Sequence, residues 1–167
     1  ELRIDDNPLV GLPAALPPKL KLLGLSVCAG VTALPDALGQ LSALEHISIG
    51  AARIQRLPDC LFETPAGVPS GLAQALRILQ LSGNTLVDLP TSLGRCYCLK
   101  TLEVSDNRLE SLPETIGSLR QLETLRASEN RLASVPTSIC DLAGLKGLSL
   151  GANHLTTLPD RLGALSK

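Results

Sequence analysis

Apolar residues recur along this chain at fixed positions, most clearly in its second half. The shared frame is L-x-x-L-x-[LVA]-x-x-N-x-L-x-x-[LV]-P, which reads LKTLEVSDNRLESLP at residues 99–113, LETLRASENRLASVP at 122–136 and LKGLSLGANHLTTLP at 145–159. Each copy starts 23 residues after the previous one. With the first Leu of the frame as position 1, apolar positions 4 and 6 alternate with positions 3, 5 and 7, which is the period of a strand with one buried face. The frame therefore predicts one short strand per copy.

The fourth position of the frame can be followed through the whole chain. It falls at Leu2, Leu23, Ile47, Leu79, Leu102, Leu125 and Leu148. Spacings of 21, 24, 32, 23, 23 and 23 residues predict seven repeats, the first of them truncated at its start. Repeats of this length predict a solenoid, in which each unit packs on its neighbours and successive strands pair in parallel.

The segments that return the chain from one strand to the next predict short helices. In PETIGSLRQL, residues 113–122, Pro suits the first helical position, and the acidic residue after it suits the positive end of the helix dipole. Ile116 and Leu119 are expected to face the core. In the first repeat, by contrast, Pro17 and Pro18 predict an extended return, because a Pro pair does not fit inside a helix.

The return segment of the third repeat, residues 59–75, is nine residues longer than the norm. Its stretch ETPAGVPSG is rich in Pro, Gly and Ser and predicts an inserted surface loop. Phe62 is expected to anchor this enlarged segment.

Position 9 of the frame holds an amide side chain in the regular repeats. The residues there are Asn84, Asn107, Asn130 and Asn153, whereas the second and third repeats have Cys28 and Ala52. We expect the Asn side chains to turn inward and to bond backbone groups of adjacent turns, which the interior would otherwise leave unpaired. Their predicted role is structural.

The frame resembles the leucine-rich repeat, in which Asn or Cys occupies position 9. The resemblance covers almost the whole chain. It implies an α/β leucine-rich-repeat solenoid shaped as a horseshoe. The parallel sheet lies on the concave face, and short helices, 3-10 turns and loops lie on the convex face. Residues 1–167 then form a single domain of seven repeats.

Two finer resemblances bear on function. LPDALGQLSAL and LPETIGSLRQL are similar to the repeats of plant intracellular Ras-group proteins and of animal Ras-pathway and cell-polarity scaffolds. The irregular first half resembles leucine-rich-repeat type III effectors of plant-pathogenic bacteria, some of which join such repeats to a separate ubiquitin-ligase domain. These resemblances imply a protein-recognition module. The alternative is the target-recognition half of an effector ligase whose catalytic domain lies outside this sequence.

Composition narrows the classes of partner. The net charge of −1 gives no electrostatic case for binding nucleic acid or an anionic membrane. One Phe, one Tyr and no Trp leave little for stacking on single-stranded bases. No apolar run is long enough to span a membrane. We therefore expect a protein partner, no nucleic acid and no membrane insertion.

Cysteine usage favours a reducing compartment. The five cysteines are an odd number without a flanking cluster, and no Asn begins a glycosylation motif. The expected location is the cytoplasm, or the host cytoplasm for a secreted bacterial effector. Cys96 and Cys98 form a single C-x-C, which is not a zinc pattern, and Cys96 occupies a buried position of the return segment.

No enzyme or cofactor is expected. His46 and His154 lie four repeats apart, about 19 Å by strand spacing, so they cannot share one small active site. The sequence contains no nucleophile-elbow, zinc-protease or phosphate-loop motif. No residue is predicted to be catalytic, to bind a cofactor or to bind a metal.

Binding in this architecture usually uses the concave face. The candidate partner-binding residues on that face are Arg3, Asp5, His46, Ser48, Gln80, Glu103, Asp106, Arg108, Arg126, Glu129, Arg131 and His154. The middle repeats present a small, nearly uncharged floor between charged patches. This floor fits a protruding loop or helix of a partner. The competing interpretation is a solvated sheet whose charges pair across strands, as Glu103 and Arg126 are placed to do. Arg126 and Arg108 are the favoured hot-spot residues, because Trp and Tyr are not available there.

The ends of the chain predict a fragment of a longer protein. The chain has no Met, and neither end shows the polar capping repeat that solenoids need for solubility. We expect a monomer, with end-to-end association through uncapped ends as the alternative.

Overall fold

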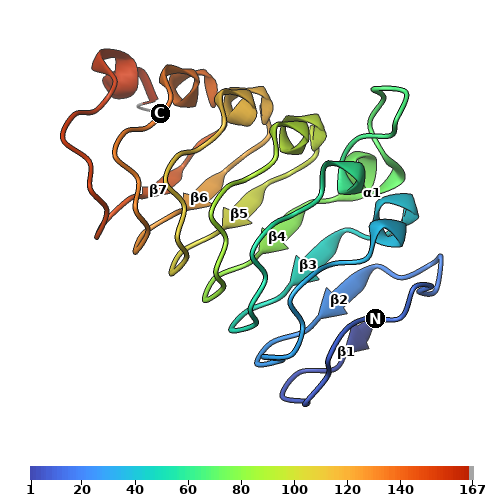
Figure 1. Cartoon of the computed structure of the whole chain (residues 1–167). Helices are drawn as coiled ribbons and strands as arrows, with labels where there is room; N and C mark the ends of the chain where they lie inside the picture. The colour runs from blue at the N-terminus through green and yellow to red at the C-terminus, as the bar shows by residue number, and fades with distance from the viewer. Residues whose placement is uncertain (166–167) are drawn as a thin grey trace.

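A computed structural model describes residues 1–165, which form one parallel sheet of seven strands in chain order (Figure 1). The strands are β1 Leu2–Arg3, β2 Leu22–Gly24, β3 His46–Ser48, β4 Ile78–Gln80, β5 Thr101–Glu103, β6 Thr124–Arg126 and β7 Gly147–Ser149. The residues at position 4 are register partners of one another, from the pair Leu2 and Leu23 to the pair Leu125 and Leu148. The prediction of one strand per repeat in a leucine-rich-repeat solenoid is therefore confirmed.

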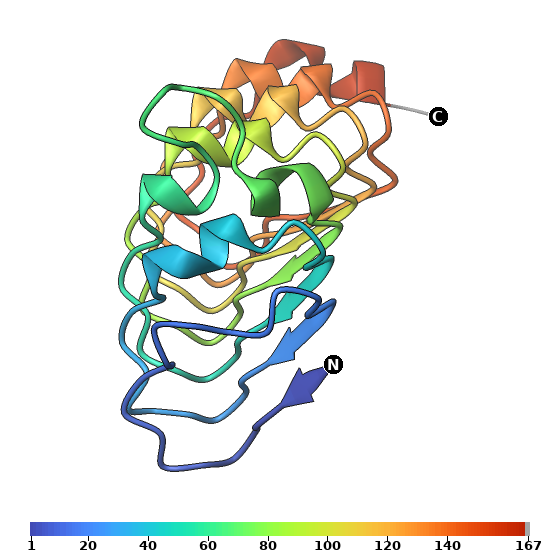
Figure 2. The same ribbon diagram turned by 90° about the vertical axis from the view of Figure 1, so that its right-hand side faces the viewer.

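The return segments lie on the convex side and are mostly single 3-10 turns (Figures 1 and 2). They are η1 Asp36–Gln40, η2 Asp59–Leu61, η3 Thr91–Arg95, η4 Glu114–Ser118, η5 Thr137–Asp141 and η6 Asp160–Leu165, with one α-helix, α1 Gly71–Ala75. The first return has a turn at residues 18–19 and no helix, as its Pro pair predicts. No helix of the described residues has the length and apolar character that crossing a membrane needs.

In the return segments that form a 3-10 turn, the proline precedes the helix, so the prediction that it takes the first helical position is wrong by one residue. Pro113 is the N-cap of η4, with φ −68° and ψ 146°. Its carbonyl accepts a hydrogen bond of 2.9 Å from the N–H of Ile116. A 3-10 bond spans three residues, so the proline closes the first turn with its carbonyl, and its missing N–H is not needed.

Successive return segments pack closely, and this explains the glycine that follows the buried Leu or Ile. A Cβ on Gly117 would collide with the carbonyl oxygen of Ser138 on η5. One on Gly39 would collide with the carbonyl oxygen of Cys60 on η2. Ile116 and Leu119 beside this glycine are 1% and 0% exposed, as predicted.

The asparagine ladder has the predicted structural role. Asn107 accepts the N–H of Leu86 at 3.0 Å, and its Nδ2 donates to the carbonyls of Leu81 and Val104 at 2.9 and 3.1 Å. Each amide thus joins its own turn to the preceding repeat. Asn130 makes the equivalent bonds one repeat further on.

The second repeat has Cys28 at position 9 in place of asparagine. The thiol of Cys28 donates to the carbonyl of Ile4 at 3.4 Å, which replaces part of the missing amide. The next repeat has Ala52 and offers no acceptor to Val31. The N–H of Val31 instead bonds the carbonyl of Cys28 at 2.9 Å. The extra residue of this repeat, Gly30, makes that turn possible.

A left-handed residue follows every strand, at position 8 of the frame. These residues have φ between 48° and 72° and are Asp6, Val27, Ala51, Gly83, Asp106, Glu129 and Ala152. The reversal it produces directs position 9 into the core, where the Asn side chain bonds. Val27 is a β-branched residue in this region and is therefore strained.

The enlarged return of the third repeat is only partly a surface loop. Residues 65–68 are exposed, but Phe62 is 1% exposed and anchors the segment, as predicted. Ser70 is also buried. Its hydroxyl donates to the carbonyl of Leu61 at 2.5 Å and accepts the N–H of Ala73 at 3.1 Å. It therefore caps α1, a helix that the sequence pattern did not predict.

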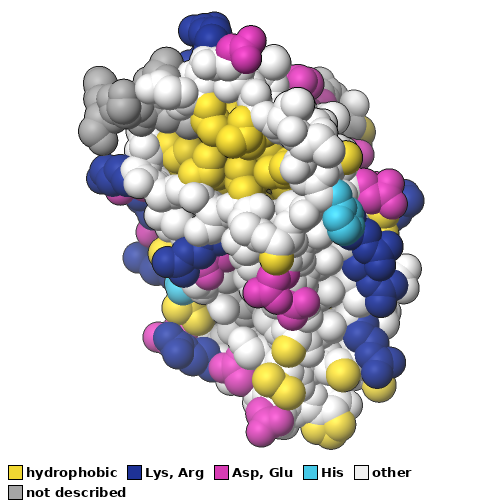
Figure 3. Space-filling model, turned by 90° about the vertical axis from the view of Figure 1, so that its left-hand side faces the viewer, with side chains coloured by type: hydrophobic (Ala, Val, Ile, Leu, Met, Phe, Trp, Pro, Cys, Tyr) yellow, Lys and Arg dark blue, Asp and Glu magenta, His cyan; other side chains and the backbone are white. Residues whose placement is uncertain are grey.

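Apolar side chains gather at the end of the solenoid that carries β7 (Figure 3). Leu148, Leu150, Leu155 and Leu162 are only partly buried there, and Leu158 is 53% exposed. End-to-end association through this face stays a prediction.

Candidate protein-binding face

A row of side chains on the concave face is joined across four strands by hydrogen bonds. His46 on β3 lies 3.1 Å from Gln80 on β4, measured from Nε2 to Oε1. Gln80 Nε2 donates to Glu103 Oε2 on β5 at 3.0 Å, and Arg126 Nη1 on β6 donates to Glu103 Oε1 at 2.9 Å. We call these four residues the concave row. All four are predicted partner-binding residues, and the fold brings them together.

The partners of these bonds fix which atom donates and which accepts along the concave row. Gln80 uses its amide nitrogen toward Glu103, so it presents its oxygen to His46, and the histidine donates from Nε2. Both carboxylate oxygens of Glu103 are occupied, and its side chain is only 19% exposed. The Arg126 side chain is 59% exposed and keeps donors free for a partner.

Beside the concave row lies a floor of small side chains. Its residues are half-buried and uncharged, and they are Ser48, Gly50, Ser82 and Ser105. Gly24 on β2 is buried, because the side chains of Arg3 and Asp5 lie over it, and it is not part of this floor. A partner element can therefore approach the backbone of β3 and β4 closely while it contacts the charged end of the concave row at β5 and β6.

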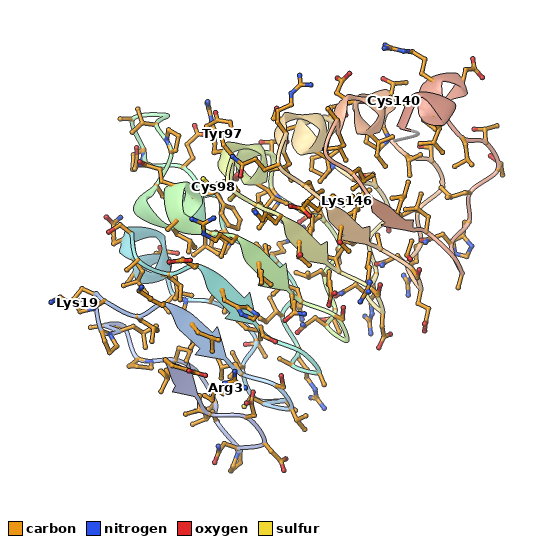
Figure 4. All side chains as sticks on the ribbon, turned by 180° about the vertical axis from the view of Figure 1, so that it is seen from behind. Arg3, Lys19, Tyr97, Cys98, Cys140 and Lys146 are labelled. Atoms are coloured by element: carbon orange, nitrogen blue, oxygen red, sulfur yellow. The ribbon has the colours of Figure 1, made fainter. Side chains whose placement is uncertain are left out.

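The two candidates of the first repeat are already engaged. Arg3 extends from β1 (Figure 4) and pairs with Glu1 at 2.6 Å. Asp5 accepts the backbone N–H of Ser26 at 2.6 Å, so this carboxylate links the first two repeats. Neither residue lies in the concave row.

The remaining candidates lie where the chain leaves the strands. Asp106 and Glu129 hold the left-handed position 8, and both are exposed. Arg108, Arg131 and His154 hold position 10 and are also exposed. No ion pair joins any of these five to another residue among the described side chains, whereas Glu103 and Arg126 pair as predicted.

A second charged row, at position 2 of the frame, was missed by the sequence analysis. Arg77 pairs with Glu45 at 3.1 Å, and Glu123 is bridged by Lys100 at 3.6 Å and Lys146 at 2.7 Å. The hydrogen bond from Lys146 lowers the pKa of Glu123. The sequence contains a signal for this second row, since a charged residue follows the first Leu of every repeat from the second to the seventh.

The cysteines are free thiols, and they do not form a metal site in the part of the chain that the structure describes. Burial raises the pKa of Cys96 to about 12, which fits its predicted core position. Burial, assisted by a hydrogen bond with Asp36, raises the pKa of Cys60 to about 11. Cys98, Tyr97 and Cys140 lie on the helix side of the molecule, away from the strands (Figure 4).

Comparison with known proteins supports the same architecture. The model of the "leucine-rich repeat region" family matches residues 70–167. A search of the curated proteins gives no match to this chain.

Solved structures match over most of the chain. A leucine-rich-repeat protein of Leptospira interrogans is 30% identical with a TM-score of 0.82, over 98% of this chain and 40% of that protein. The ectodomain of the Arabidopsis thaliana receptor kinase GASSHO1/SCHENGEN3, in complex with CASPARIAN STRIP INTEGRITY FACTOR 2, is 25% identical with a TM-score of 0.68, over 85% of this chain and 19% of that one. The Arabidopsis receptor kinase HAESA shares the fold at 23% identity, with a TM-score of 0.65 over 84% of this chain and 22% of that one. The chain thus spans less than half the length of each.

Proposed function

The chain belongs to the leucine-rich-repeat proteins, and we propose that it is a recognition module that binds a partner protein on its concave face. The observation that carries this proposal is the concave row of His46, Gln80, Glu103 and Arg126. These side chains are held in place before any partner arrives, so little side-chain entropy is lost on binding. Arg126, the exposed end of the row, is of the residue type that dominates hot spots.

The neighbouring floor supports the same assignment. Its small side chains let a partner backbone approach β3 and β4, and the concave row supplies polar contacts that orient the partner at one side of the floor. A related receptor ectodomain of the same fold has been solved in complex with a factor that it binds, which supports a protein or peptide as the partner here. The fold alone does not fix function, so the proposal depends on this face.

The test is affinity capture from lysate with variants of the concave face alone. Ser82→Arg fills the floor and Arg126→Glu reverses the charge at the end of the row. The matched control carries Lys19→Glu and Arg120→Glu, two exposed changes on return segments. We expect a partner that both concave variants lose by at least about tenfold and the control retains. Equal retention by all folded variants would overturn the proposal.

The alternative is the target-recognition part of a bacterial effector ubiquitin ligase that acts in the host cytoplasm. One observation favours it, namely the helix-free return at Pro17 and Pro18. Sequencing the complete gene separates the two, because the alternative requires a ligase domain in the parent protein. For the primary function, we propose the cytoplasm as the location.

A further inference from the structure

We propose that a pocket on the flank of the solenoid, between Arg53 and Arg108, binds an acidic side chain of the partner protein. The inference rests on the proposed function and adds a second anchoring point outside the concave row. We call this site the flank pocket. Its lining residues are Arg53, Gln55, Thr85, Val87 and Arg108, and its volume is about 290 Å³.

A second hydrogen-bonded ladder fixes the register of the flank. In the third to seventh repeats, the N–H of the position-10 residue bonds the carbonyl at position 11 of the preceding repeat. Arg53 bonds Val31 at 3.2 Å, and Arg108 bonds Leu86 at 2.9 Å. Thr85, Arg131 and His154 continue this ladder. Arg53, Thr85 and Arg108 therefore stand side by side on three successive repeats, about 10 Å from first to last by the spacing of paired strands.

The pocket is electropositive and its charges are unsatisfied. Both arginines are exposed, and neither forms an ion pair among the described residues, unlike Arg77 and Arg126. The lining contains no acidic residue. Figure 3 shows Lys and Arg side chains gathered along one edge of the molecule, below a histidine. Two guanidinium groups on either side of a shallow hollow suit a carboxylate, which accepts paired N–H donors.

The pocket adjoins the concave floor, so one partner can reach both. The left-handed position between them carries only Ala51 and Gly83 in the third and fourth repeats. In the fifth and sixth repeats the same position carries Asp106 and Glu129, which repel an acidic group. Asp106 Oδ2 lies 3.7 Å from where a Cβ on Gly83 would stand, so we expect the partner side chain to leave the floor over Ala51.

The chemistry of the lining favours a protein carboxylate over nucleic acid. Val87, 38% exposed, gives the pocket an apolar wall that suits the methylene groups of Glu. No aromatic ring lines the pocket, so bases would have nothing to stack on. The chain's net charge of −1 also gives no general attraction for a phosphate backbone.

The experiment selects linear random peptides displayed on phage against the wild-type protein and measures synthetic copies by calorimetry. The test variant is Arg53→Gln with Arg108→Gln. The control, Lys19→Gln with Arg120→Gln, also removes two positive charges, but from return segments outside the pocket. We expect selected peptides to share an Asp or Glu. The affinity of these peptides should fall at least about tenfold for the test variant, but less than about twofold for the control. Replacing the acidic residue of the peptide with Asn or Gln should weaken binding to the wild-type protein equally.

Three outcomes would overturn the proposal that the flank pocket binds an acidic side chain. In the first, Arg126→Glu abolishes peptide binding, but Arg53→Gln with Arg108→Gln leaves it unchanged. This result would refute the flank pocket and leave the proposed function standing. A library that yields no binder would count against both. Binding of a mixed-sequence single-stranded RNA, lost in the test variant while the peptides are unaffected, would replace the carboxylate with a phosphate.

Discussion

At the scale of single residues, the amide at position 9 ties each repeat to its neighbour. Asn107 bonds one N–H and two buried carbonyls of two different repeats. Asn7, at the start of the chain, bonds only carbonyls of its own turn, Ile4 and Asp5, and is exposed. The same residue type therefore has very different energetic weight at the two positions.

We predict that Asn107→Ala lowers the free energy of unfolding by at least about 2 kcal/mol. The change leaves buried backbone groups without partners, at about 1–3 kcal/mol for each. Asn7→Ala is the control, and it should cost less than about 1 kcal/mol, because its carbonyl partners can bond water. Urea unfolding measures both. Equal losses would mean that the amide acts through its own turn and not between repeats.

The residue scale also shows what the sequence could and could not reveal. The inward role of Asn84 and its counterparts was predictable, because an amide at one fixed position between apolar residues has few other uses. The left-handed position 8 was not, because Asp, Val, Ala, Gly and Glu all occupy it. The conformation also occurs before Cys28 and Ala52, so neither its own side chain nor a following amide imposes it. It belongs to the turn that ends each strand.

At the scale of elements, the enlarged third return is a packed part of the core with a short exposed tip. Phe62 is buried beneath it, and Arg95 on η3 pairs with Glu63 at 3.2 Å. Its Pro- and Gly-rich sequence predicted an inserted surface loop, and residues 65–68 are exposed. The sequence did not predict α1, because a helix of five residues is too short to show a periodic pattern of apolar positions.

Phe62→Ala should lower the free energy of unfolding by about 3–5 kcal/mol, because it empties a large buried site. Tyr97→Ala removes the other aromatic, which is 47% exposed, and should cost less than about 1 kcal/mol. Chemical denaturation of both variants checks the pair. A small effect of Phe62→Ala would show that the third return is not part of the cooperative core.

The buried thiol of Cys96, the C-cap of η3, predicts that stability depends on pH. The pKa of Cys96 is about 12 in the folded protein against 9.0 for an ordinary thiol. Above pH 9 the unfolded chain releases this proton and the folded chain retains it. The stability contributed by the neutral thiol is therefore complete below pH 9 and is lost as pH rises toward 12, by up to about 1.4 kcal/mol per pH unit.

Cys96→Ala should accordingly lose less stability than wild type as pH rises from 9 to 11. The difference in unfolding free energy between the two proteins is the quantity to measure, since other groups titrate equally in both. A difference that stays constant across this range would contradict the burial of a neutral thiol.

At the scale of the whole molecule, charge is divided between satisfied and unsatisfied surfaces. On the concave row and at position 2, charged side chains largely pair across strands. At position 10 they do not. The repeat frame predicted which side chains face outward, and it brought His46, Gln80, Glu103 and Arg126 to one face. It could not reveal that they bond in one row, or that Arg53 joins Arg108 around a pocket, because both depend on side-chain direction between repeats.

The central claim is that a partner protein docks on the concave face, and site-specific photo-crosslinking tests it most directly. A benzophenone amino acid replaces Ser105, which is half-buried on that face, or Ser118, which is exposed on η4. The account predicts a crosslinked partner from position 105 and none from position 118. Crosslinking from position 118 alone, or equally from both positions, would contradict it.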